Sequence, residues 1–122
     1  MSGKRSAVNF SEFRAMRKHL IKLDKLDERR YYQQALQKAK DVAAMLKEHY
    51  GVKQVYLYGS LAWGGFDRHS DIDLYLVGFQ GNYWRAYSEA EDIVAPIEIS
   101  LACEEDCIIS LKDKVLEKGV LL

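Results

Sequence analysis

The chain has 122 residues, which is enough for one hydrophobic core and too few for two. With 48% hydrophobic residues, 30% charged residues and a single proline, its composition excludes a disordered chain. No apolar run approaches the roughly 20 residues of a membrane span, and the basic N-terminus lacks the apolar segment of a secretory signal, so we expect a cytoplasmic protein with no membrane partner.

The formal net charge of zero conceals an uneven distribution of charge along the chain. Residues 1–50 carry 12 basic and 6 acidic side chains, whereas residues 51–122 carry 6 basic and 12 acidic ones. Basic side chains in the first half could bind nucleic acid or an acidic partner, but a solvated helix face explains them more simply. We therefore do not expect nucleic acid as a partner.

The first half of the chain predicts two helices. Asn9 and Glu12 fit a capping box, and the hydrophobic spacing that follows predicts a helix from about residue 10 to the mid-twenties, with a break near Asp24–Asp27. The second helix ends at Gly51 and rests on an apolar stripe formed by Tyr32, Leu36, Ala39, Ala43 and Leu46. We predict a helical extension over residues 1–30 and a single compact domain over residues 31–122.

The second half predicts strands and two further helices. Residues 52–58, 71–78 and 95–102 read as strands, because they are rich in β-branched and aromatic residues or alternate apolar and polar side chains. Helices are predicted over residues 83–93 and 104–118, and the final Val-Leu-Leu forms either an edge strand or a packed tail. The predicted fold class is α+β, with helices packed on a small mixed sheet.

Cys103 and Cys107 lie four residues apart, a spacing that places two side chains on one helix face. With no further Cys or His residue nearby, they make a poor disulfide and an incomplete zinc site. We expect two small, half-buried side chains.

Two carboxylates begin the predicted strand at residues 71–78. Period-two geometry puts Asp71 and Asp73 on one face of that strand, with Ile72 and Leu74 on the core face. Like charges so close repel each other, and a divalent cation such as Mg²⁺ relieves the repulsion while binding phosphate oxygens. Solvent exposure at a strand end is the simpler alternative. Other acids lie on predicted helices and are expected to take no part in catalysis: Glu89, Glu91, Asp92, Glu104, Glu105 and Asp106.

Gly59 and Ser60 end the preceding strand. Without a side chain, Gly59 lets the backbone approach a phosphate, and the Ser60 hydroxyl can donate to phosphate oxygens. Ten residues separate this pair from Asp71-Ile72-Asp73. The arrangement resembles the signature of the polymerase-β-like nucleotidyltransferase superfamily, and the short chain resembles its minimal members, the MNT-type antitoxins encoded beside HEPN-domain toxins.

This resemblance implies a palm-like fold and a set of site residues. Asp71 and Asp73 would hold two catalytic Mg²⁺ ions together with a third acid on a nearby strand, which Glu98 matches in the run Ile97-Glu98-Ile99. Gly59, Ser60 and Ser70 would bind the nucleotide.

The sequence departs from the family pattern at two positions. Glu98 stands where relatives usually carry Asp, and Trp63 stands where many carry an arginine able to contact phosphate. Arg68 or His69 could compensate for that arginine. Trp63 itself could stack on a base or fill the space beside the loop.

The resemblance also implies a reaction and a partner. The donor would be ATP, and the acceptor would be a tyrosine of a HEPN-domain toxin that AMP inactivates. Because the chain has no residues left for an acceptor domain, another protein should complete the site, either the HEPN partner or a second copy in a homo-oligomer. The basic residues 10–30 could form that interface or simply cover the sheet. Two alternatives remain open, a catalytically weak module that neutralises its partner by occlusion and an RNA-binding or structural module.

Overall fold

The computed structural model describes the backbone of residues 10–122 and the side chains from residue 26 onward. The chain divides into two compact units, Met1–Tyr31 and Tyr32–Leu122. Helix α1 runs without interruption from Phe10 to Tyr50, so the predicted break near Asp24–Asp27 is wrong. That segment reads Asp-Lys-Leu-Asp and contains no proline or glycine, so nothing in it stops a helix. The predicted capping residue Asn9 lies outside the described residues.

Within the second unit, α1 packs through its small residues. Ala39, Ala43 and Leu46 of the predicted stripe are buried, whereas Tyr32 is 40% exposed. The Tyr32 hydroxyl donates to the carbonyl of Leu61 at 3.4 Å. The helix stops at the predicted place, since Gly51 adopts a positive φ of 63° that favours glycine.

The four strands form one mixed sheet in the order β3-β2-β1-β4. They are β1 (Gln54–Tyr58), β2 (Ile72–Val77), β3 (Ile99–Cys103) and β4 (Val120–Leu121). Strand β1 runs antiparallel to both β2 and β4, while β2 and β3 run parallel. The predicted α+β class is therefore confirmed, and the C-terminal residues form an edge strand.

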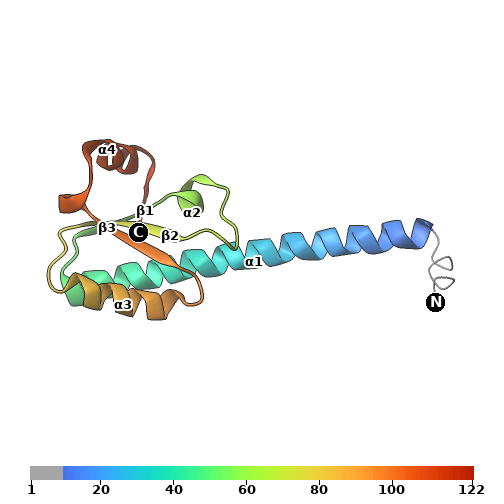
Figure 1. Cartoon of the computed structure of the whole chain (residues 1–122), viewed down its shortest axis with the longest axis horizontal. Helices are drawn as coiled ribbons and strands as arrows, with labels where there is room; N and C mark the ends of the chain where they lie inside the picture. The colour runs from blue at the N-terminus through green and yellow to red at the C-terminus, as the bar shows by residue number, and fades with distance from the viewer. Residues whose placement is uncertain (1–9) are drawn as a thin grey trace. The chain divides into compact units, whose positions relative to one another are not determined.

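Helices cover the two faces of this sheet differently. One face packs against α1 and α3 (Tyr83–Val94), and α4 (Ile109–Lys118) lies over the other (Figure 1). The face toward α1 and α3 carries a buried aliphatic core: Val55, Leu57, Ile72, Leu74, Leu76, Ile99 and Leu101. The opposite face carries Tyr56, Tyr58, Asp73 and Tyr75. Period-two alternation along β2 thus places a core on one face and polar groups on the other.

The predicted helix over residues 104–118 is wrong in its first turn. Residues Glu104–Asp106 form a short 3₁₀ helix, η2, and Cys107 and Ile108 are extended before α4 begins. A salt bridge spans this break, in which the ammonium of Lys112 lies 2.7 Å from the carboxylate of Glu104. None of the described helices combines the length and apolar character needed to cross a bilayer.

The two cysteines do not share a helix face, contrary to the prediction. Cys103 ends β3 and Cys107 follows η2. Both are free thiols, with Cys103 buried and Cys107 half-buried. The expectation of two half-buried side chains is therefore confirmed for Cys107 and wrong for Cys103.

Candidate active site

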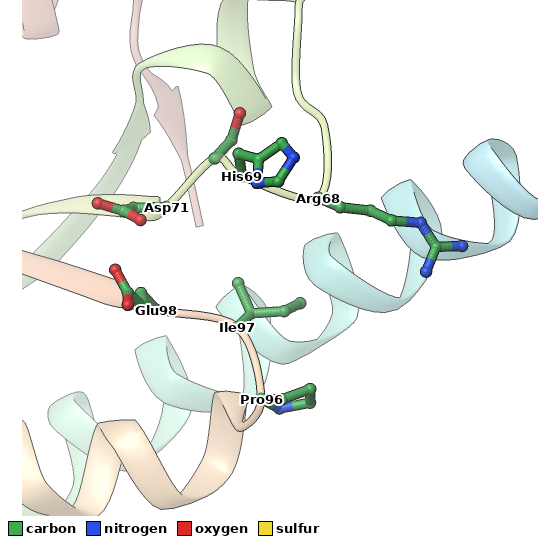
Figure 2. Close-up of a pocket in the computed structure, with 7 residues that line it drawn as sticks. Arg68, His69, Asp71, Pro96, Ile97 and Glu98 are labelled. Carbon is green, nitrogen blue, oxygen red and sulfur yellow. The ribbon is translucent and has the colours of Figure 1, made fainter.

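The site is built where β2 and β3 begin side by side. Ile72 pairs with Ile99 in the parallel register, and the Ile72 amide donates to the Glu98 carbonyl at 2.9 Å. Asp71 and Glu98 are therefore neighbours at the same end of adjacent strands, and their carboxylates face each other in Figure 2. Asp71 and Glu98 are 27 positions apart in the sequence and lie together because parallel pairing extends one residue before the start of β3.

A cavity of about 230 Å³ opens beside these two carboxylates. It is lined by Arg68, His69, Ser70, Asp71, Pro96, Ile97 and Glu98. Both side chains suggested as substitutes for the missing arginine thus line this cavity, although the Arg68 side chain extends away from the carboxylates (Figure 2). Asp73 and Gly59 are not part of this wall.

Asp73 lies two residues after Asp71, within β2, and directly against Gly59. Asp73 pairs with Tyr58 at the end of β1, and a Cβ added at residue 59 would collide with the Asp73 carboxylate. Gly59 also has a positive φ of 76°. Glycine at this position therefore makes room for the aspartate as well as for the sharp turn into α2 (Ser60–Trp63). The sequence had suggested only an approach of the backbone to phosphate.

The electrostatics of Asp73 reflect this confinement. Burial and the neighbouring charge of Asp71 raise its pKa from 3.8 to about 6. Burial and the charge of Asp73 in turn raise the pKa of Tyr58 to about 12. The start of β2 thus concentrates negative charge in a half-buried place where a cation would be stabilised.

The carboxylates of Asp71, Asp73 and Glu98 are of the chemical type that binds a divalent cation. Carboxylate oxygens are the ligands that hard divalent ions prefer, and phosphate or water oxygens usually complete their coordination. Asp71 lies close to each of the other two carboxylates, because its carboxylate faces that of Glu98 and its charge raises the pKa of Asp73. Among the described side chains, however, no three His, Cys, Asp or Glu residues converge as a ready metal cluster. Asp71, Asp73 and Glu98 are brought to one edge of the sheet but not into a single three-ligand group.

The two predicted phosphate-binding serines differ in what holds them. Ser60 is half-buried and begins α2, whose N-cap Gly59 offers no side-chain acceptor to the helix amides. Ser70 belongs to a turn, in which its hydroxyl donates to the Asp67 carboxylate at 3.2 Å and accepts from the Asp67 amide at 3.1 Å. Ser70 lines the carboxylate cavity, but its hydroxyl is engaged within the loop.

Sequence reasoning missed Asp67 as the organiser of this loop. Its carboxylate also accepts from the His69 amide at 2.8 Å, and these hydrogen bonds lower its pKa. An Asp followed three residues later by Ser is a common turn pattern and could have indicated this role. The turn sets the direction in which the chain enters β2 at Asp71.

Trp63 fills the space beside the loop. Its indole Nε1 donates to the Lys118 carbonyl at 2.9 Å, and the ammonium of Lys114 lies 4.8 Å from its ring centroid. The Tyr58 ring is its aromatic neighbour at 6.2 Å. Of the two roles suggested by the sequence, these contacts favour packing over base stacking, because they join α2 to the end of α4.

The site residues all fall within a segment that matches a known family. The family model described as "Polymerase beta, Nucleotidyltransferase" matches residues 40–122. The chain belongs to this family. Membership identifies it as a nucleotidyltransferase, and members of the family act on nucleoside triphosphates with a divalent metal.

Individual relatives agree with this assignment. The chain is 34% identical over 78 residues to a candidate protein adenylyltransferase of Methanocaldococcus jannaschii, a match covering 62% of this chain and 77% of the relative. The solved structure of a candidate minimal nucleotidyltransferase superposes with a TM-score of 0.63 at 20% identity, covering 75% of this chain and 95% of that one. The predicted nucleotidyltransferase fold is therefore confirmed.

Proposed function

We propose that this nucleotidyltransferase transfers AMP from ATP to a tyrosine hydroxyl of a HEPN-domain toxin and thereby acts as its antitoxin. The observation that carries the proposal is the acidic edge of the sheet, where Asp71 lies beside Glu98 and Asp73 lies against Gly59. The name of the Methanocaldococcus relative supports a protein as the acceptor. The resemblance to MNT-type antitoxins supports the tyrosine and the HEPN partner.

Asp71, Asp73 and Glu98 would hold Mg²⁺, in keeping with their carboxylate donors and the raised pKa of Asp73. When bound, the ion neutralises charge on the phosphates during the displacement. Gly59 and Ser60 would bind the phosphate chain at the start of α2. Gly59 and Ser60 would thereby orient the α-phosphate toward the cavity that Asp71 and Glu98 line.

In the proposed reaction, the acceptor hydroxyl oxygen forms a bond to the α-phosphorus of ATP. The bond between that phosphorus and the bridging oxygen to the β-phosphate breaks, so pyrophosphate leaves with the electron pair. Glu98, whose carboxylate borders the cavity, accepts the hydroxyl proton. The product is an adenylylated tyrosine.

The test uses ATP labelled on the α-phosphate, Mg²⁺ and a HEPN-domain protein from the same genome as acceptor. We expect label to move to one tyrosine, located by mass spectrometry, and Asp73→Asn to slow transfer by about 100-fold or more. The exposed Asp113, on α4, provides a matched control, and Asp113→Asn should transfer at the wild-type rate.

Two results would argue against the proposal. Label that fails to reach any protein acceptor would exclude adenylylation of a toxin. Protection of cells by an Asp71→Asn/Asp73→Asn double variant would instead support neutralisation by occlusion, the alternative suggested by Trp63 and Glu98.

A further inference from the structure

A second cavity adjoins the carboxylate cavity and has no part in the proposed chemistry. It has a volume of about 340 Å³ and runs along the end of α3. We call it the α3 groove, and it is lined by Ser88, Glu91, Asp92, Ala95, Pro96, Ile97 and Glu98. Pro96, Ile97 and Glu98 also line the carboxylate cavity, so the two cavities lie next to each other and share Glu98 as a wall residue.

The α3 groove is acidic, and helix stability does not explain why. Glu91, Asp92 and Glu98 are exposed in its lining, which contains no basic side chain. Glu91 and Asp92 lie in the last turn of α3, where the helix dipole disfavours negative charge. Lys38 of α1 reaches this helix end, but its ammonium donates to the backbone carbonyls of Val94 and Ala95 at 3.4 and 2.9 Å. The carboxylates of Glu91 and Asp92 therefore lie where the dipole of α3 disfavours them.

An exposed tryptophan lies on the same face of α3, one turn before the groove. Trp84 is 73% exposed and precedes Ser88 by four residues, which puts the two side chains side by side on a helix. Its ring packs edge-on against Tyr83 and Tyr87, with centroids 5.2 and 6.1 Å away. A large aromatic that stays exposed on a firm base is typical of a binding anchor.

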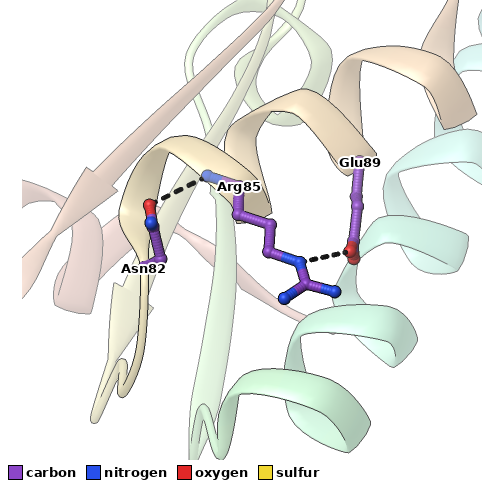
Figure 3. Close-up of polar contacts among 3 residues, drawn as sticks. All are labelled: Asn82, Arg85 and Glu89. Carbon is purple, nitrogen blue, oxygen red and sulfur yellow. Dashed lines mark hydrogen bonds and ion pairs between the residues drawn. The ribbon is translucent and has the colours of Figure 1, made fainter.

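The base beneath this tryptophan is fixed to the sheet. The hydroxyls of Tyr83 and Tyr87 donate to carbonyls of β3 at 2.6 and 3.1 Å. The neighbouring cation, Arg85, lies 3.7 Å from Glu89, and Asn82 caps the helix by accepting from the Arg85 amide (Figure 3). Trp84 therefore shares α3 with the groove residues Glu91 and Asp92, and this helix ends beside the proposed active site.

We infer that the α3 groove binds a basic, tyrosine-bearing segment of the acceptor protein and directs its hydroxyl to Glu98. The inference rests on the proposed function and adds the chemistry of the acceptor. Lysine or arginine residues of the segment pair with Glu91 and Asp92, and an apolar side chain packs on Trp84. Nucleic acid is disfavoured as an occupant, because its phosphates would face three carboxylates.

The test measures binding of two fluorescent peptides of equal length by anisotropy, at low and at high salt. Each carries one tyrosine and one leucine; in one peptide arginines flank the tyrosine, and in the other glutamates do. We expect the basic peptide to bind more tightly to the wild-type chain and Glu91→Gln/Asp92→Asn to weaken it about fivefold. Trp84→Ala should weaken it about tenfold, since it removes the anchor.

The matched control is Glu48→Gln/Asp113→Asn, which removes the same two charge types from exposed positions on α1 and α4. Its affinity should stay within about twofold of wild type. Equal weakening by both double variants, or equal binding of the acidic peptide or of a short RNA, would overturn the inference. Binding is measured without nucleotide, so the groove can be confirmed even where no AMP is transferred, and transfer can be confirmed where the groove variants bind normally.

Discussion

The two faces of the central sheet belong to the same strands but differ in the polar groups that they bury. Among the described side chains, those buried on the face toward α1 and α3 are apolar, such as Leu57 and Leu74. The opposite face buries the Tyr75 hydroxyl without a hydrogen-bond partner among the described residues, and it holds Asp73 half-buried beside a like charge. Stability therefore comes mainly from the first face, while the second retains polar groups suited to binding.

The largest expected effect is on the first face. Leu74 is fully buried between the sheet and its helices. Leu74→Ala should lower the free energy of unfolding by about 3 kcal/mol, because it removes apolar burial and leaves a cavity. Chemical denaturation measures this change. A loss below that of an exposed substitution such as Leu116→Ala would contradict the assignment of the core to this face.

Gly59→Ala should be the next most damaging change, although the glycine is outside the core. The added Cβ meets the Asp73 carboxylate, and the positive φ is strained for alanine, so we expect a loss of about 2 kcal/mol. Nucleotidyl transfer should fall as well. In a double-mutant cycle, Asp73→Ala should relieve part of the cost. Strictly additive effects would show that the two residues do not share this space.

Asp73→Asn should stabilise the protein at neutral pH while abolishing transfer. Asp73 titrates near pH 6 when folded and near 3.8 as a free side chain, so between these values the folded state binds more protons and stability falls as the pH rises. Allowing for half-exposure, the cost above pH 6 is about 1 kcal/mol. Denaturation at pH 7.5 and at about pH 3.5 checks this. A gain that is equal at both pH values would contradict it.

Tyr75→Phe should produce the smallest effect and distinguish the faces most simply. Removing a buried, unpaired hydroxyl should leave stability unchanged or raise it by up to about 1 kcal/mol, opposite in sign to Leu74→Ala at the preceding residue. Thermal unfolding of both variants gives the comparison. A clear loss in Tyr75→Phe would mean that the hydroxyl has a partner, such as an ordered water.

Alternation along the strands made much of this arrangement predictable. Ile72, Leu74, Ile99 and Leu101 are buried as the period of two required, and parallel pairing then put Asp71 beside Glu98. Contacts between distant elements were not predictable. Trp63 packs against the end of α4, which no local pattern reveals.

Three other features of the structure differ from the sequence prediction. The long helix α1 crosses a charged segment that resembles a break but contains no residue that stops a helix. The salt bridge between Glu104 and Lys112 accompanies a break in a segment whose composition alone favours a continuous helix. The turn of Asp67 and Ser70 also diverts a hydroxyl that spacing alone assigned to phosphate.

We expect the face of the sheet that carries Asp73 to sacrifice stability because it binds a nucleotide together with a divalent cation. Thermal unfolding of wild type and Asp73→Asn, each with and without ATP and Mg²⁺, tests it most directly. Without ligand the variant should melt at the higher temperature, and ATP with Mg²⁺ should raise the melting temperature of the wild type alone. Equal stabilisation of both proteins, or of neither, would contradict the claim.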